Sequence, residues 1–319
     1  MKLVIQIPCY NEENTLPVTI NALPKAIDGI DDIEILVIND GSTDNTAEVA
    51  KSCGADYILN IPHNSGLAKA FSAGLNKSLE MGADIIVNTD ADNQYCADDI
   101  QKLVAPIINN EADIVIGARP VSAIKHFSLL KKFLQKLGSW VMRKISSTNV
   151  EDAPSGFRAF SKYAAVRLNV FDRYTYTLET IIQARAKQLI IKSVPIRVNG
   201  DLRKSRLVRN IFDYVFRSIF TMARIFVIYR PFRFFAILAS LFLLSGTLIG
   251  LRFLYYYIFS SGQGHIQSLI LASILFITGV QIAVIAILSE LISINRKLLE
   301  DIQRRLKIYD LHNYNKGLE

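Results

Sequence analysis

The stretch IIVNTDADNQ, residues 85–94, decides the fold of this chain. Three β-branched apolar residues are followed at once by polar and acidic ones, which is typical of a buried strand that ends at a ligand-binding edge. Asp90 and Asp92 are one residue apart, so their carboxylates repel each other unless a cation lies near them. Mg²⁺ and Mn²⁺ prefer such oxygen ligands and can neutralise a diphosphate leaving group. An acidic turn that caps the next helix stays the alternative.

Short β-branched runs alternate with helical patterns on both sides of this stretch. We expect strands at residues 3–7, 33–39, 57–60, 85–89 and 114–117. We expect helices at residues 15–26, 44–52, 67–80 and 98–108, with Gly54 and Gly82 where helices end. This alternation predicts an α/β fold in which helices cover a parallel sheet.

Three other strand ends carry polar segments, and parallel strands present their carboxyl ends at one edge of a sheet. These segments are PCYNEE (8–13), NDGSTD (39–44) and HNSGLAK (63–69). A buried acid in the first two is suited to accept a hydrogen bond from a nucleobase or a ribose, with helix capping as the alternative. In the third, Lys69 is placed to face a phosphate, although a lone lysine is by default a surface residue.

The last third of the chain is apolar enough to enter a membrane. Hydrophobic residues make up 50% of the 319 residues, which is high for a purely soluble protein. The excess lies in residues 232–259 and 268–294, each long enough for a transmembrane helix. Lys and Arg flank the pair but are missing from 260–267, so we expect both termini in the cytoplasm. The net charge of +7 favours anionic phospholipid over nucleic acid as a partner, because the cations cluster beside the apolar helices.

Two further segments are amphipathic. Residues 122–147 combine lysines with apolar residues at roughly helical spacing, which predicts a surface helix or helix pair, or a core-covering helix with a basic outer face. Residues 207–229 are expected to lie along the membrane face before Pro231 turns the chain into the bilayer. The three scattered cysteines suit a reducing compartment and argue against a disulfide framework.

Five motifs follow one another along the first part of the chain: residues 8–13, 39–44, 90–94 (DADNQ), 117–119 (GAR) and 152–158 (DAPSGFR). With them the chain closely resembles the inverting glycosyltransferases of family 2. Within that family it resembles the branch of dolichyl-phosphate mannose synthase and bacterial polyprenyl-phosphate glycosyltransferases. The resemblance covers residues 1–206. It implies a GT-A fold, a Rossmann-like, mixed and mainly parallel sheet with helices on both faces, followed by interfacial amphipathic helices and two transmembrane helices.

The resemblance also implies an activity and its site. A sugar would pass, with inversion, from a UDP- or GDP-linked donor to a polyprenyl phosphate of dolichyl or undecaprenyl type, at the cytoplasmic face of a bacterial or archaeal plasma membrane. Mg²⁺ or Mn²⁺ would be held by Asp90, Asp92 and Gln94. The implied catalytic residues are Asp92, Asp152 and Arg158. The implied donor-binding residues are Pro8, Tyr10, Glu12, Asp40, Lys69, Asp90 and Ala91.

Cations lie where this branch holds the phosphate of its lipid acceptor, and arginine forks suit a phosphate. The implied residues around the acceptor phosphate are four cations and one serine: Arg119, Arg158, Lys204, Ser205 and Arg206. For the loop 203–206, contact with anionic phospholipid alone is the alternative. A phosphate acceptor is already an anionic nucleophile, so catalysis would rest on alignment and charge neutralisation. Asp152 is the candidate base if the acceptor is instead a hydroxyl of a membrane glycolipid or a glycan precursor.

The sequence departs from the family at Asn39, where many relatives carry an acid, which weakens inferences about the base. No Gly-x-Gly-x-x-Gly follows the first strand, which argues against a nicotinamide-dependent oxidoreductase. The missing Gln-x-x-Arg-Trp argues against a processive polysaccharide synthase. The spacing of Gly246 and Gly250 leaves homo-oligomerisation open. The expected organisation is a catalytic domain (1–206), interfacial helices (207–231), a transmembrane hairpin (232–294) and a basic cytoplasmic tail (295–319).

Overall fold

The computed structural model describes residues 1–120, 150–170, 176–200, 231–259 and 266–316, together with residues 224 and 227. The chain divides into two compact units, one made of Met1–Ile219 with Arg304–Glu319 and the other of Phe220–Gln303. The expected amphipathic segment 122–147 lies outside the described residues, and so does 207–229 apart from residues 224 and 227.

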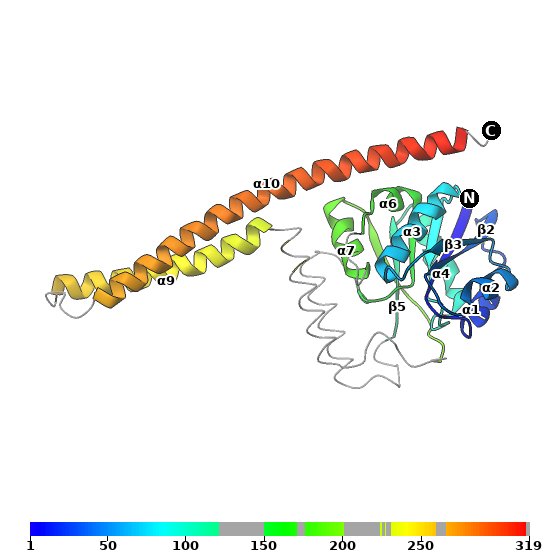
Figure 1. Ribbon diagram of the computed structural model, residues 1–319, viewed down its shortest axis with the longest axis horizontal. Coiled ribbons are helices and arrows are strands. Elements are labelled where there is room, and N and C mark those ends of the chain that lie inside the picture. Colours follow the sequence, from blue (N-terminus) through cyan, green and yellow to red (C-terminus); the bar gives the residue numbers. More distant parts are fainter. Residues whose placement is uncertain are drawn as a thin grey trace. The chain divides into compact units, whose positions relative to one another are not determined.

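A β-sheet forms the centre of the first unit (Figure 1). It has seven strands in the order β3-β2-β1-β4-β6-β5-β7. Its strands are β1 (Lys2–Cys9), β2 (Asp32–Asp40), β3 (Tyr57–Ile61), β4 (Ile85–Asn88), β5 (Ile114–Ala118), β6 (Arg158–Ser161) and β7 (Ile191–Pro195). All neighbouring strands are parallel except that β6 runs antiparallel to both β4 and β5. The prediction of a mixed, mainly parallel sheet is therefore confirmed.

Helices cover both faces of this sheet because the side chains of a strand alternate between its faces. The helices of the unit are α1 (Leu16–Ala22), α2 (Thr46–Ser52), α3 (Leu67–Glu80), α4 (Ile100–Ile108), α6 (Lys162–Arg167) and α7 (Thr177–Ala186). Leu3, Ile5 and Ile7 of β1 pack into one buried cluster with apolar residues of α1 and α4. Gln6 of the same strand points to the other face, where it lies against Gly74 of α3. The predicted two-faced α/β domain is confirmed.

Local sequence explains where the expected helices end. The helix expected over 15–26 ends at Ala22, because Pro24 disfavours a helical conformation of the preceding residue, and Leu23 is extended with ψ 142. Gly54 and Gly82 follow α2 and α3 with positive φ angles of 88° and 83°, as expected of residues that end helices. The helix expected over 98–108 begins at Ile100, after a single 3₁₀ turn (Ala97–Asp99).

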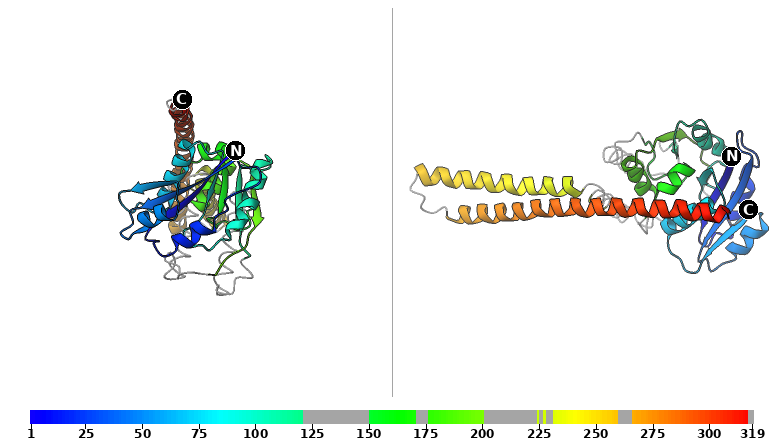
Figure 2. Two further views of the ribbon diagram at one scale, coloured as in Figure 1. Left: turned by 90° about the vertical axis from the view of Figure 1, so that its right-hand side faces the viewer. Right: turned by 90° about the horizontal axis from the view of Figure 1, so that it is seen from above.

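The second unit contains α9 (Pro231–Phe259) and most of α10 (Ile266–Lys316). Both are long and apolar enough to cross a membrane, and their most apolar 18-residue stretches have mean hydropathies of 2.3 and 2.5. Figure 2 shows α9 beside α10, and a Cβ added to Gly246 would lie 3.1 Å from the carbonyl oxygen of Ala272. Gly246 therefore lets the two helices approach closely. Helix α10 continues through the expected tail to Lys316, because no proline or glycine interrupts residues 295–316.

Candidate active site

Three of the predicted polar segments meet at one edge of the sheet. Strand β1 lies between β2 and β4, with Cys9 opposite Asn39 and Gln6 opposite Asn88. Neighbouring strands are about 5 Å apart, so the loops that follow these strands are adjacent. Burial raises the pKa of the Cys9 thiol, and the nearby charges of Glu12, Asp44 and Asp90 raise it further. The predicted acids of the first, second and fourth strand ends are thus gathered around one point.

The loops after β1 and β2 are bound to each other through backbone and side-chain hydrogen bonds. The N–H of Asn11 donates to Ser42 Oγ at 3.0 Å, and the N–H of Thr43 donates to Asn11 Oδ1 at 2.8 Å. Glu12 is buried, and its Oε2 accepts from the hydroxyl of Thr15 at 2.7 Å. These contacts fix the direction of the Glu12 carboxylate. Beside it Pro8 is buried, whereas Tyr10 is 40% exposed, which leaves the ring accessible to a ligand.

Asp40 holds the start of α3. Its two carboxylate oxygens accept from the backbone N–H groups of Ser65 and Gly66, at 2.8 and 2.9 Å. Gly41 makes this approach possible, since a Cβ there would lie 2.6 Å from backbone atoms of His63 and Asn64 and its φ is +67°. A nucleotide-binding role for Asp40 stays a prediction, and these contacts show a positioning role. Lys69 is exposed in the first turn of α3.

The acidic loop, residues 90–94, follows β4 directly. Gln94 Nε2 donates to Asp90 Oδ2 at 2.7 Å, and the Gln94 N–H donates to Asp92 Oδ1 at 3.3 Å. Burial and the charge of Asp92 raise the pKa of Asp90 from 3.8 to about 6, although hydrogen bonds from Gln94 and Tyr95 and the charge of Arg119 oppose this. The carbonyl of Ala91, which is buried, accepts from Thr19 Oγ1 of α1 at 2.9 Å. The loop therefore concentrates negative charge that its surroundings do not fully compensate.

This donor set fits a divalent cation. Two carboxylates and the amide oxygen of Gln94 are the hard oxygen ligands that Mg²⁺ and Mn²⁺ prefer. Burial and, after it, the charge of Asp92 raise the pKa of Asp90, and a cation bound here would favour the ionised carboxylate. Among the described residues there is no group of three His, Cys, Asp or Glu side chains that could hold a metal by themselves. A site here would thus need the Gln94 amide, water or ligand oxygens in addition to the two carboxylates.

Gly156 brings the DAPSGFR segment against the acidic loop. Its carbonyl accepts from Asn88 Nδ2 at 3.0 Å and from Tyr176 Oη at 3.2 Å, while its N–H donates to Tyr95 Oη at 3.2 Å. A Cβ at this position would lie 3.1 Å from both carboxylate oxygens of Asp90. Only a glycine fits here without displacing that carboxylate.

Arg119 and Asp152, which we predicted on the acceptor side, form a buried ion pair. Arg119 Nε and Nη2 donate to Asp152 Oδ2 and Oδ1 at 2.7 and 3.1 Å, and the Arg119 N–H donates to Oδ2 at 3.2 Å. Side-chain exposures are 12% for Arg119 and 2% for Asp152. Both oxygens of the candidate base therefore already accept hydrogen bonds from the Arg119 guanidinium.

Arg158 is fully buried, and its guanidinium points into the protein. It donates to the carbonyl oxygens of Ser155, Thr177 and Ala153 at 2.8, 2.8 and 2.6 Å, and to Thr180 Oγ1 at 2.7 Å. Burial lowers its pKa to about 10, so the side chain stays charged at neutral pH. The predicted contact with substrate stays a prediction, and these bonds fit a residue that shapes the DAPSGFR segment. Lys204, Ser205 and Arg206 lie outside the described residues.

Sequence reasoning missed several residues that shape the site. Asn88 precedes the acidic pair, Tyr95 follows it, and Tyr176 lies far along the chain, yet all three contact Gly156. Tyr95 also stacks on Phe157 with ring centroids 4.9 Å apart. The positions of Asn88 and Tyr95 beside the acidic pair were the available signals. Contacts such as that of Tyr176 with Gly156 join residues that are far apart in sequence and are not visible in a single sequence.

Comparisons with known proteins agree with this geometry. A family model described as glycosyl transferase family 2 matches residues 4–175. The chain is 35% identical over 213 residues to a UDP-N-acetylglucosamine–dolichyl-phosphate N-acetylglucosaminyltransferase of Methanococcus voltae, covering 60% of this chain and 83% of that protein. It is 29% identical over 218 residues to an undecaprenyl-phosphate mannosyltransferase of Micrococcus luteus, covering 65% and 88%.

A solved structure shares the fold. Glucosyl-3-phosphoglycerate synthase from Mycobacterium tuberculosis, in complex with Mn²⁺, UDP and glucosyl-3-phosphoglycerate, matches with a TM-score of 0.55 and 19% identity. The match covers 71% of this chain and 78% of that one. At this identity the likeness shows the fold alone. With the family model, the relatives and the GT-A sheet taken together, the chain belongs to glycosyl transferase family 2 and is a glycosyltransferase.

Proposed function

We propose that this glycosyltransferase moves a sugar from a nucleoside diphosphate to a polyprenyl phosphate at the cytoplasmic face of a membrane. The observation that carries the proposal is the acidic loop at the carboxyl end of β4, next to the loops that hold Glu12 and Asp40. The polyprenyl-phosphate acceptors named for the Methanococcus voltae and Micrococcus luteus proteins support the choice of acceptor.

The donor would lie along the edge formed by the first, second and fourth strands. Tyr10 offers an exposed ring for the nucleobase, and the fixed carboxylate of Glu12 is suited to accept from the base or the ribose. Lys69 projects from the first turn of α3, where a cation attracts phosphate. The choice between a UDP- and a GDP-linked sugar belongs to this proposal and is decided by assay.

Asp90, Asp92 and Gln94 would hold the divalent cation, Mg²⁺ or Mn²⁺. When bound, the cation supplies charge that stabilises the departing nucleoside diphosphate. The protein's own contribution is to keep the three side chains in one turn, through the bonds of Gln94 to both aspartates and of Thr19 to Ala91. The Mn²⁺ and Mg²⁺ named with the glucosyl-3-phosphoglycerate synthase structures support the type of cation.

The acceptor side favours a phosphate over a hydroxyl. In an inverting transfer the acceptor oxygen attacks the anomeric carbon, the new C–O bond forms, and the bond to the diphosphate breaks. A hydroxyl acceptor must lose its proton to a base, but both oxygens of Asp152 accept from Arg119. A phosphate already carries its negative charge and needs no base, so alignment is enough. Transfer to a hydroxyl of a glycolipid or glycan precursor is the second candidate, and it requires the Arg119–Asp152 pair to separate.

Two apolar helices would keep the catalytic unit at the bilayer where a polyprenyl phosphate is found. Both α9 and α10 reach the length and hydropathy needed to span a membrane. The cationic residues before α9 and in the last part of α10 favour a cytoplasmic catalytic unit and cytoplasmic termini.

The test uses the purified full-length protein with Mn²⁺, a polyprenyl phosphate and a panel of radiolabelled UDP- and GDP-sugars. We expect one donor to give a chloroform-soluble product that mild acid cleaves, because a sugar phosphodiester at the anomeric carbon is acid-labile. With an extract of native membrane lipids in place of the polyprenyl phosphate, a labelled lipid that resists mild acid would support the hydroxyl acceptor instead. No labelled lipid with any donor would contradict the proposal.

A further inference from the structure

A short segment after β7, residues 197–199, runs alongside the acidic loop. Tyr95 and Val198 form an antiparallel bridge, and the N–H of Cys96 donates to the carbonyl of Arg197 at 3.3 Å. The N–H of Asn199 donates to the carbonyl of Gln94 at 2.9 Å. Although the two segments are far apart in sequence, backbone contacts thus join them at Gln94, one of the proposed cation ligands.

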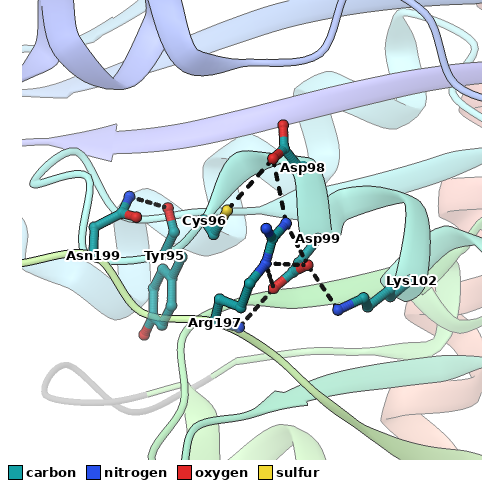
Figure 3. Close-up of polar contacts among 7 residues, drawn as sticks. All are labelled: Tyr95, Cys96, Asp98, Asp99, Lys102, Arg197 and Asn199. Atoms are coloured by element: carbon teal, nitrogen blue, oxygen red, sulfur yellow. Dashed lines mark hydrogen bonds and ion pairs between the residues drawn. The ribbon is translucent and has the colours of Figure 1, made fainter.

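The side chain of Asn199 binds the carbonyls on both sides of Gln94. Its Nδ2 donates to the carbonyl oxygen of Asn93 at 2.9 Å and to that of Tyr95 at 3.1 Å, and Figure 3 shows the contact with Tyr95. With its backbone N–H on Gln94, one residue holds three consecutive carbonyls in and beside the acidic loop. Asn93 has a φ of 52°, a left-handed conformation that the surrounding contacts must maintain.

An ion pair with the buried Asp99 anchors the segment that carries Asn199. The N–H of Arg197 donates to Asp99 Oδ2 at 2.6 Å, and its guanidinium contacts the same carboxylate, with Nη2 3.0 Å from Oδ1 (Figure 3). Lys102 Nζ lies 2.9 Å from Asp99 Oδ1. Although burial of Asp99 opposes it, the hydrogen bonds from Arg197 and Lys102 lower the pKa of this carboxyl. The anchor therefore stays ionised, and it sets where Asn199 meets the loop.

We infer that Asn199 is a positioning residue for the divalent cation, which it does not contact itself. Its amide holds the turn that carries Asp92 and Gln94. Without that amide both side chains are still present, but their positions relative to each other are less restricted. The inference rests on the proposed function, since it takes the acidic loop as the cation site. Replacing a residue that orients metal ligands without contacting the metal typically weakens metal affinity by about tenfold or more.

The test compares Asn199→Leu with the wild-type full-length protein. Leucine keeps the shape of asparagine but removes both amide donors, and Asn199 is exposed, so we expect the fold to persist. Asn109→Leu is the matched control. Asn109 is the C-cap of α4, at the end of that helix that is farther along the chain from the acidic loop. Titration of Mn²⁺ followed by electron paramagnetic resonance should give a Kd about tenfold weaker for Asn199→Leu and unchanged for Asn109→Leu. In the transfer assay, the KM for Mn²⁺ should rise while kcat at saturating Mn²⁺ is largely kept.

The ways in which this test can fail are distinguishable. Equal Mn²⁺ affinities of wild type and Asn199→Leu would overturn the inference and leave the proposed function standing. If Asn109→Leu weakened Mn²⁺ binding as much as Asn199→Leu, the inference would be overturned too, because the loss would then not depend on contacts with the acidic loop. A wild-type protein that binds no Mn²⁺ would overturn the cation site and the inference together.

Discussion

Replacing Asp90 with asparagine should stabilise the metal-free protein at neutral pH. The pKa of Asp90 is raised from 3.8 to about 6, first by burial and then by the charge of Asp92. Between these two values the folded protein keeps a proton that the unfolded chain has released. The free energy of unfolding therefore falls as the pH rises from about 4 to about 6, and it stays lowered above that range. An asparagine at this position carries no charge, so Asp90→Asn should restore the free energy of unfolding that ionised Asp90 removes.

The size of the effect follows from the shift. One pKa unit corresponds to about 1.4 kcal/mol, so ionised Asp90 costs the metal-free fold at most about 3 kcal/mol. Asp90 is half-buried, so its removal from solvent is incomplete, and screening by solvent reduces the expected gain from Asp90→Asn to about 1–2 kcal/mol. For a domain of this size, that gain corresponds to a rise in Tm of about 2–8 °C. The amide keeps an oxygen that can accept from Gln94, so the loop should not collapse.

The assay is thermal unfolding of the full-length protein in detergent with EDTA, at about pH 7.5 and about pH 4. We expect the gain in Tm at the higher pH only, because Asp90 is already protonated at the lower one. Asp28→Asn, which neutralises an exposed carboxylate, is the control and should change neither value. With Mn²⁺ in place of EDTA, the Tm of the wild type should rise but that of Asp90→Asn should not. A lower Tm for Asp90→Asn in EDTA at about pH 7.5 would refute this account of the acidic loop.

Three further substitutions test other parts of the site. Asp92→Ala should abolish turnover while expression and membrane insertion stay unchanged, and retained turnover would count against the cation site. Gly156→Ala places a methyl group 3.1 Å from both Asp90 oxygens, so we expect turnover to fall by roughly tenfold with little change in Tm. Full activity of Gly156→Ala would show that the close approach of Gly156 to the Asp90 carboxylate is not needed for turnover. Arg158→Met removes the guanidinium hydrogen bonds to three buried carbonyls and should destabilise the protein by about 3 kcal/mol, seen as a lower Tm. An unchanged Tm would contradict the positioning role of Arg158.

Much of the fold was readable from local patterns. The helix expected over 67–80 has those bounds, and each of the first five strands lies within two residues of its predicted position. These elements have strong β-branched runs or a clear apolar face, and Gly54 and Gly82 mark helix ends through their positive φ angles. The antiparallel insertion of β6 between β4 and β5 was not readable from residues alone, because strand order depends on contacts far apart in sequence.

For the candidate site, the sequence indicated which residues lie close together but not which partners each of them contacts. That Asp90, Asp92 and Glu12 lie near one another follows from the rule that parallel strands end at one edge, and the structure brings their loops together. What a motif residue binds was less predictable. Arg158 turns inward to backbone carbonyls, and Asp152 is taken up by Arg119, because the nearest partners of a charged side chain are set by tertiary packing.

The central claim is that this chain joins a sugar to a polyprenyl phosphate through its anomeric carbon. The most direct measurement is ³¹P NMR of purified protein incubated with a polyprenyl phosphate, diamagnetic Mg²⁺ and the donor that supports turnover. We predict that the phosphomonoester signal of the lipid is replaced by a phosphodiester signal, in equal amount to the nucleoside diphosphate released. Release of nucleoside diphosphate while the lipid phosphomonoester stays unchanged would contradict the claim.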